Sequence, residues 1–279
     1  MNPIQRTRKR ISVVLIVTLF LGGVGTALYF ALRSEPTCYD GKRNQGEEQS
    51  DCGGPCPPCA VAYDAPPEPF SVEESAILPG GQPETYDVLA RVRNPNDELG
   101  ASVMTYHFVL KGQDGEVLVE DEEVGFILPQ ETKTFLGIGL SAESKPVSAE
   151  ISFSDIEWQK FDGYQAKPPM SVINKRYEEL SSGPFFSEAI GTFANDSTFD
   201  FKSVLLKIVL RDANGDPIAF NQTEMNTVLS GEYRDFILRF PDSFPGQVAS
   251  MDVEPDIDFF RDENFVERYR PREQYQEFR

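Results

Sequence analysis

The stretch SVMTYHFVLKGQDGEVL, residues 102–118, alternates apolar and polar side chains and then runs into a glycine-containing turn. Alternation with a period of two predicts a β-strand with one buried face, formed here by Met104, Tyr106, Phe108 and Leu110. The dipeptide Asp114–Gly115 is typical of a type I′ hairpin turn, because both central residues of that turn need positive φ. The stretch therefore predicts a hairpin and an all-β fold.

The same pattern returns 100 residues later, where residues 202–218 read KSVLLKIVLRDANGDPI. The expected core-facing set in this copy is Val204, Leu206, Ile208 and Leu210, followed by the turn dipeptide Asn214–Gly215. Flanking blocks repeat as well, since 69–72 returns at 169–172, Phe135 returns as Phe236, and 155–158 returns at 256–259. The last two pairs are 101 residues apart, which indicates one inserted loop residue. The sequence thus predicts two tandem copies of about 90 residues each.

The repeat defines the predicted domain boundaries. We expect β-sandwich 1 at 69–160 and β-sandwich 2 at 169–260, with a linker at 161–168 and a charged C-terminal tail at 261–279. Each copy is long enough to bury a core of its own, and its turn spacing suggests about seven strands in an immunoglobulin-like or fibronectin-like sandwich. The glycine and two prolines of the linker allow the sandwiches either to pack together or to hinge. The tail is expected to be flexible or partly helical.

A family resemblance adds to this fold prediction. Phe108 and Leu110 end the strand of the first copy and are followed by Lys111 and Gly112, while the second copy has Ile208, Leu210, Arg211 and Asp212. Each copy resembles the FxLYD type of bacterial immunoglobulin-like domain, in which F-x-L-Y-D ends a strand before a hairpin. Neither copy carries the full motif. The resemblance implies a fold, and it implies no particular activity because sandwich domains host many functions.

The N-terminal region predicts a membrane anchor. Residues 11–32 contain 22 consecutive uncharged and mostly apolar residues, enough for a helix to cross a bilayer, and we expect a transmembrane helix at 11–33. The preceding segment 1–10 carries four basic residues, whereas Arg33 alone follows the apolar run directly. By the positive-inside rule, segment 1–10 is a cytoplasmic basic tail and the remainder of the chain lies outside the plasma membrane.

Two further interpretations of the anchor stay open. A cleaved signal peptide would use Gly25 and Ala27 as the small residues before the cut, although its apolar region would usually be shorter. An uncleaved helix presents Gly23, Ala27 and Ala31 at four-residue steps. Such a small-residue face lets two membrane helices approach closely, which makes a homodimer one expected arrangement.

All four cysteines, Cys38, Cys52, Cys56 and Cys59, fall in a predicted collar at 34–60. Export to an oxidising compartment favours structural disulfides, whose pairing the spacing leaves open among three connectivities. A zinc site is a second interpretation, but only the second half of the spacing resembles a zinc knuckle. A redox pair at Cys56 and Cys59 is the third. A proline-rich spacer is expected at 61–68.

Acidic and amide side chains gather between the first two cysteines. Asp40, Asn44, Glu47 and Asp51 supply hard oxygen atoms of the kind that Ca²⁺ prefers, although the loop lacks the EF-hand spacing. Residues 38–59 resemble a C-x-DG-x-x-N-x-x-E-x-x-x-DCGG-x-C-x-x-C module of bacterial cell-surface proteins, which implies a surface location. The alternative is that these acids are solvated loop residues. Apart from calcium, no cofactor is expected.

Candidate catalytic residues are few. His107 is the only histidine, and it occupies the strand face opposite Tyr106 and Phe108. Its counterpart in the second copy is Lys207, so a solvent-facing position is predicted for both. We find no Ser-His-Asp arrangement, histidine-rich metal set or phosphate-binding glycine loop in the sequence. The protein is therefore expected not to be an enzyme.

Charge differs sharply between the two sides of the predicted membrane. Residues 1–33 carry five basic and no acidic side chains, whereas residues 34–279 carry 21 Lys and Arg against 45 Asp and Glu, a formal charge of −24. A region this acidic repels nucleic acids and anionic lipid surfaces. The expected partners are the membrane, through the anchor, and proteins of the cell envelope.

Three functions are compatible with these observations. The first is a single-pass, membrane-anchored extracytoplasmic protein that presents two immunoglobulin-like domains for protein–protein interaction or cell-envelope assembly. The second is a calcium-dependent adhesion or ligand-binding module. The third is a CxxC thiol-disulfide oxidoreductase. The first is favoured because the sandwich repeat accounts for most of the chain, whereas the other two depend on the collar alone.

Overall fold

The computed structural model describes residues 20–23, 38, 43, 46, 52, 54–56, 66–261, 265, 266 and 268. The chain divides into two compact units, residues 1–62 and 63–279. In the first unit, residues 20–23 are helical. No helix within the described ranges has the length and hydrophobicity to cross a membrane. Most of the anchor predicted at 11–33, Ala27 and Ala31 included, lies outside the described residues and stays a prediction.

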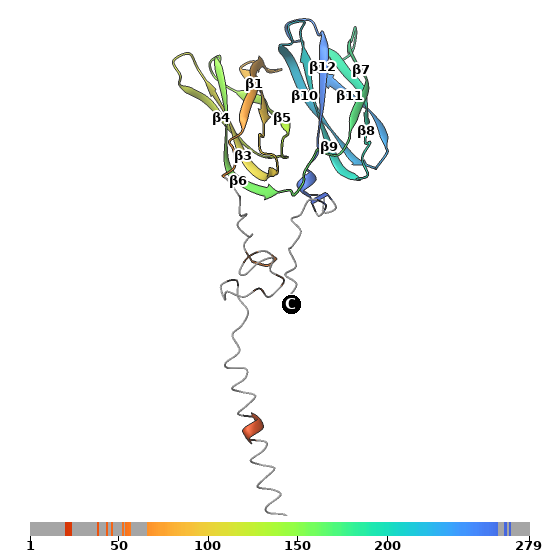
Figure 1. The fold of residues 1–279 in the computed structure, drawn as a ribbon. Helices are drawn as coiled ribbons and strands as arrows, with labels where there is room; N and C mark the ends of the chain where they lie inside the picture. Colours follow the sequence, from red (N-terminus) through yellow and green to blue (C-terminus); the bar gives the residue numbers. More distant parts are fainter. Residues whose placement is uncertain are drawn as a thin grey trace, which may run out of the picture. The chain divides into compact units, whose positions relative to one another are not determined.

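The first half of the second unit is a sandwich of two three-stranded antiparallel sheets (Figure 1). Its strands are β1 (Ser71–Pro79), β2 (Thr85–Arg93), β3 (Leu99–Lys111), β4 (Val117–Ile127), β5 (Thr132–Ser141) and β6 (Ser148–Lys160). One sheet has the order β1-β2-β5 and the other the order β4-β3-β6. We call this domain sandwich 1.

The second half repeats this topology strand for strand and is called sandwich 2 (Figure 1). Its strands are β7 (Ser171–Glu179), β8 (Ser187–Ala194), β9 (Phe201–Arg211), β10 (Pro217–Val228), β11 (Tyr233–Phe240) and β12 (Ser250–Asp256), followed by a 3₁₀ turn at Phe259–Arg261. The sheets have the orders β11-β8-β7 and β10-β9-β12, so β7, β8 and β11 correspond to β1, β2 and β5. The all-β, two-sheet prediction is confirmed.

The prediction of about seven strands per copy is wrong, because each sandwich has six in the part of the chain that the structure describes. The segment after each sixth strand is buried in an aromatic cluster and forms no seventh strand. Phe161, after β6, is fully buried, and Phe259, after β12, is 2% exposed. Burial of these rings stabilises the packed, non-strand conformation of these segments.

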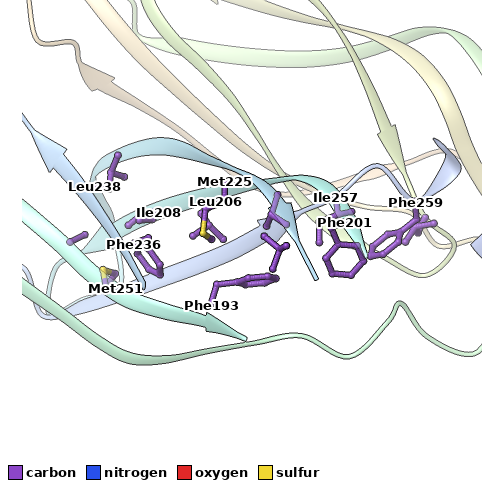
Figure 2. Close-up of a cluster of buried hydrophobic side chains, with 14 of the residues drawn as sticks. Phe193, Phe201, Leu206, Ile208, Met225, Phe236, Leu238, Met251, Ile257 and Phe259 are labelled. Atoms are coloured by element: carbon purple, nitrogen blue, oxygen red, sulfur yellow. The ribbon is translucent and has the colours of Figure 1, made fainter. Parts of the chain in front are cut away.

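The predicted core faces are confirmed in both copies. Met104, Phe108 and Leu110 of β3 are at most 1% exposed, and the four predicted residues of β9 are fully buried. Figure 2 shows the core of sandwich 2, where side chains from both sheets, among them Phe193, Leu206 and Phe236, gather between the sheets. Each buried side chain of this size stabilises the fold by about 1.5–3 kcal/mol relative to an exposed one.

The hairpin turns are present, but the predicted type I′ geometry is wrong. Only the glycines, Gly115 (φ 80°) and Gly215 (φ 89°), have positive φ in these turns. In the second copy Gly215 N–H donates to the Asp212 carbonyl, and Asp212 N–H donates to the Asp216 carbonyl. This is a type I turn followed by a left-handed glycine, the other common short hairpin connection. The Asp212 carboxylate favours it by accepting the N–H groups of Asn214 and Asp216.

A buried asparagine follows the second strand of each sandwich. Asn94 is fully buried, and its amide donates to the carbonyls of Leu99 (2.7 Å) and Leu128 (2.9 Å). Asn195 makes the matching bonds to Phe199 (2.8 Å) and Leu229 (3.0 Å). Each amide thus satisfies two backbone carbonyls, one near the start of the third strand and one just after the fourth.

The linker is packed and does not form an exposed hinge. Phe161 contacts the rings of Tyr164, at a centroid distance of 5.9 Å, and of Phe260, at 5.4 Å. Phe265, in the segment predicted to be a flexible or partly helical tail, is helical, 1% exposed and 5.0 Å from the ring of Phe259. Of the two arrangements that the linker composition allowed, the structure has the packed one.

Candidate functional site at the interface of the two sandwiches

The collar supplies one observed cross-link. A disulfide joins Cys38 and Cys56, and Cys52 is also disulfide-bonded. Cys59 lies outside the described residues. An oxidised CxxC redox site would pair Cys56 with Cys59. Cys56 is instead bonded to Cys38.

The predicted calcium ligands Asp40, Asn44, Glu47 and Asp51 also lie outside the described residues, so that hypothesis stays a prediction. Within the described ranges, no three or more His, Cys, Asp or Glu side chains come together as a metal site would require.

His107 has more partners than its sequence context indicated. Its Nε2 lies 3.1 Å from Ser154 Oγ and its Nδ1 lies 3.8 Å from Glu122 Oε2, so a serine, a histidine and an acid do meet on the outer face of β4-β3-β6. The Ser154 hydroxyl, however, donates to Asp155 Oδ2 at 3.0 Å. A catalytic serine must instead give its proton to the histidine. The cluster therefore has the hydrogen bonding of a structural network.

The prediction that Lys207 faces solvent is wrong. Lys207 is 6% exposed because sandwich 1 covers the outer face of β9. Its Nζ lies 2.6 Å from Asp256 Oδ2 and donates to the Thr134 carbonyl at 2.5 Å. The presence of a lysine at the position equivalent to His107 therefore did not indicate exposure to solvent. Burial at this position depends on whether a neighbouring domain covers it.

A second lysine from sandwich 1 shares the same carboxylate. Lys133 is 2% exposed, and its Nζ lies 2.7 Å from Asp256 Oδ1 and 3.1 Å from the ring centroid of Phe126. Burial lowers the pKa of Lys133, against the opposing effect of Asp256. Burial alone would raise the pKa of Asp256, but the two ammonium groups outweigh it and hold that pKa at about 2. We call Lys133, Asp256 and Lys207 the buried charge cluster.

Further polar contacts join the two sandwiches beside this cluster. Glu254 of β12 accepts the backbone N–H of Thr134 at 2.9 Å and its hydroxyl at 2.7 Å. Arg211 at the end of β9 donates to both carboxylate oxygens of Glu74, at 2.6 and 2.9 Å, and to Asp252 at 2.5 Å. A bidentate arginine–carboxylate pair fixes the relative orientation of the two side chains as well as their distance.

Apolar contacts fill the space between these polar pairs. Leu89 and Leu136, on the outer face of β1-β2-β5, pack against Val209 and Phe220, on the outer face of β10-β9-β12. All four are at most 6% exposed. The first sheet of sandwich 1 is therefore covered on both faces, by its own core and by sandwich 2.

Two clefts border this interface. The first, of about 350 Å³, is lined by Arg91, Thr134, Lys175, Lys207, Val209, Arg211, Asp252, Val253, Glu254 and Pro255. The second, of about 460 Å³, is lined by residues of the β1–β2 turn and β5 from sandwich 1 and by residues 218–221 and 240–244 from sandwich 2. Two carboxylates, Asp87 and Asp242, face this second cleft, which we call the acidic cleft.

Comparison with known proteins gives no family. No protein-family model matches the chain. No curated protein matches it. Among solved structures, a transglutaminase from red sea bream shares 11% identity over 66% of this chain, with a TM-score of 0.20. The match spans 29% of the length of that enzyme, and at this TM-score it carries no functional argument.

Sequence reasoning missed the interface for an identifiable reason. The apolar run Ile208–Leu210 of β9, which places Val209 on the outer face, signals a strand buried on both faces. The equivalent run Phe108–Leu110 has the same pattern, with Val109 on the outer face of the sheet. No other domain covers that outer face within the described chain. The same apolar pattern is present in both copies, so it does not show which of the two strands has a covered outer face.

Proposed function

We propose that the protein is a single-pass, membrane-anchored extracytoplasmic protein whose two sandwiches form one rigid unit for protein–protein interaction or cell-envelope assembly, without enzymatic turnover. The buried charge cluster is the observation that carries the proposal. It holds Asp256 of sandwich 2 against Lys133 of sandwich 1, and both side chains are at most one-tenth exposed.

Rigidity follows from the energetics of the cluster. Removing one partner from a buried ion pair typically costs about 3–5 kcal/mol, because the remaining charge stays buried without compensation. Rotating one sandwich against the other would separate Asp256 from Lys133 and Thr134 from Glu254. A fixed pair of domains suits a presenting role. When a partner contacts both sandwiches, no freedom of motion between the two domains has to be lost on binding.

The location rests on sequence. The apolar segment at 11–32, the basic residues before it and the formal charge of −24 after residue 33 support an anchor with an exported C-terminal region. The disulfides of Cys38 and Cys52 agree with an oxidising compartment. The resemblance of residues 38–59 to a module of bacterial cell-surface proteins supports the same location.

A protease-protection experiment on the full-length chain in a bacterial host tests this proposal. Protease added to intact cells, with the outer membrane opened if one is present, is expected to release an ectodomain fragment and leave the N-terminal tail with the membrane. The fragment is expected to resist further cleavage because the linker is packed. Recovery of the whole chain in the cytoplasm, inaccessible to protease, would refute the membrane-anchored location.

A further inference from the structure

The acidic cleft has the size and position of a ligand site. Its volume of about 460 Å³ lies within the range typical of small-ligand pockets, which commonly form where two domains meet. One wall comes from the turn between β1 and β2 and from the end of β5. The other comes from the start of β10 and the segment after β11. Because the interface contacts hold both walls, the cleft is preformed.

Much of the lining is apolar. Leu78 and Ile138 line it from sandwich 1, and Ile218, Phe220 and Phe244 line it from sandwich 2. Ile138 remains 45% exposed although it lies on a strand at the domain interface. A ligand with apolar groups would therefore bury surface that the protein alone leaves in contact with water.

The charges in the cleft are unbalanced. Asp87 accepts the Gly139 N–H at 2.7 Å, and burial raises the pKa of its carboxyl group against the effect of this hydrogen bond. None of the residues that line the cleft is basic. Among the described residues, no Lys or Arg forms an ion pair with Asp87 or Asp242. A partly desolvated carboxylate without a cation is a common feature of a binding site.

A glycine brings the second carboxylate across the domain boundary. A Cβ atom on Gly81 would lie 2.4 Å from Asp242 Oδ2, closer than nonbonded atoms approach. Asp242 of sandwich 2 therefore lies directly against the backbone of sandwich 1, and a larger residue at position 81 would displace its carboxylate from this place. The two carboxylates belong to the same cleft although they come from different domains.

The first cleft shows the opposite charge balance. Two of its cations, Lys207 and Arg211, are paired with Asp256 and with Glu74 and Asp252. Its fixed charges are thus largely satisfied inside the protein. The two clefts border the same interface, and the acidic cleft is the one that leaves carboxylates for a ligand to neutralise.

We propose that the acidic cleft binds an extended peptide segment of a protein partner that carries an Arg or Lys side chain flanked by apolar residues. The cationic group pairs with Asp87 and Asp242, and the neighbouring apolar side chains pack against Ile138, Ile218 and Phe244. This proposal rests on the proposed function and specifies the chemistry of the partner.

Selection from a random displayed-peptide library, with the full-length chain in detergent micelles as the target, tests it. We expect the selected peptides to carry Arg or Lys next to apolar residues. Replacing the selected Arg by citrulline, which removes the charge and keeps the shape, is expected to weaken binding at least about tenfold in calorimetry. Asp87→Asn and Asp242→Asn are expected to weaken it similarly.

These variants are chosen to keep the fold. Asparagine at position 87 keeps an acceptor for the Gly139 N–H. Asp114→Asn is the matched control, because Asp114 is an exposed turn residue whose counterpart is already Asn214, and it is expected to leave binding unchanged. Peptides without basic residues, or equal binding to Asp87→Asn and the wild type, would overturn the proposal. Neither result would affect the membrane location, which the protease experiment tests separately.

Discussion

The two sandwiches share a topology, but the basic residue at one equivalent position has different surroundings: the Lys133 side chain is 3% exposed and the Arg234 side chain 32%. Lys133 of sandwich 1 corresponds to Arg234 of sandwich 2, 101 residues later. Arg234 pairs with Glu232 and donates to the carbonyls of Asn226 and Thr227, all within sandwich 2. Lys133 instead pairs with Asp256 of the neighbouring domain. Sandwich 2 is therefore self-contained at this edge, whereas sandwich 1 depends on its neighbour.

The outer faces of β5 and β11 also differ in how far the other sandwich covers them. Leu136 of β5 is 6% exposed, while its counterpart Ile237 of β11 is 51% exposed. The first residue contacts the other sandwich, and the second lies on a face without a neighbouring domain in the described chain.

The largest effect is expected from Asp256→Ala. This change leaves Lys133 and Lys207 buried without their carboxylate and should lower the free energy of unfolding by about 3–5 kcal/mol. Denaturant titration measures it. Asp155→Asn, at the equivalent position of sandwich 1, is the control and should cost less than about 1 kcal/mol, since Asp155 is exposed and asparagine tolerates its φ of 48°. Equal losses in the two variants would contradict the comparison of the sandwiches.

A somewhat smaller effect is expected for the apolar contacts. Leu136→Ala removes a buried side chain from the interface and should cost about 2–4 kcal/mol, because a cavity remains. Ile237→Ala, at the repeat-equivalent position, should cost less than about 1 kcal/mol because that side chain is half exposed. Thermal unfolding of both variants tests this. If Ile237→Ala proved the more damaging, the outer face of sandwich 2 would have to be covered in the native assembly.

Acidification should weaken the interface. The pKa of Asp256 is held at about 2 in the folded state, below its ordinary value of 3.8. Its contribution, about 2 kcal/mol, is therefore fully present above pH 3.8 and is lost as the pH falls toward 2. Unfolding free energies measured across this interval should show the loss in the wild type. Asp256→Asn should show less pH dependence in the same interval, and an equal slope would indicate that other carboxylates dominate.

The smallest effect concerns the collar in comparison with the sandwiches. If the cysteines act as a structural cross-link, reductant should lower the thermal midpoint of the collar while the sandwiches, whose described residues contain no cysteine, remain unchanged. A chelator should then have no effect. A collar that loses thermal stability on chelation would support calcium binding by Asp40, Asn44, Glu47 and Asp51.

Much of the fold was predictable from local pattern. The period-two alternation of β3 and β9 identified their inward faces, because a strand inside a sandwich places every second side chain in the core. The turn dipeptides located both hairpins, although they did not establish the turn type. That detail depended on hydrogen bonds that backbone N–H groups donate to the Asp212 and Glu116 carboxylates, which sequence spacing does not display.

The candidate sites were much less predictable. Asp87 and Asp242 are more than 150 positions apart, and nothing in either local sequence indicates that they face one cleft. Lys207 was misplaced because its burial depends on sandwich 1, where the Thr134 carbonyl accepts its ammonium group. His107 acquired a serine partner only because β6 pairs with β3 in the observed register.

The amino-acid sequence by itself determined the two-copy organisation, the β-strands and their inward faces, since these follow from repeated periodic patterns within about 20 residues. It also placed the cysteines and the apolar N-terminal segment. Only the tertiary structure decided that the sandwiches pack together through the buried charge cluster and leave the acidic cleft beside it. The physical reason is that solvation of Lys133, Lys207 and Asp256 depends on atoms from both domains, and their pairing exists only once the domains have packed.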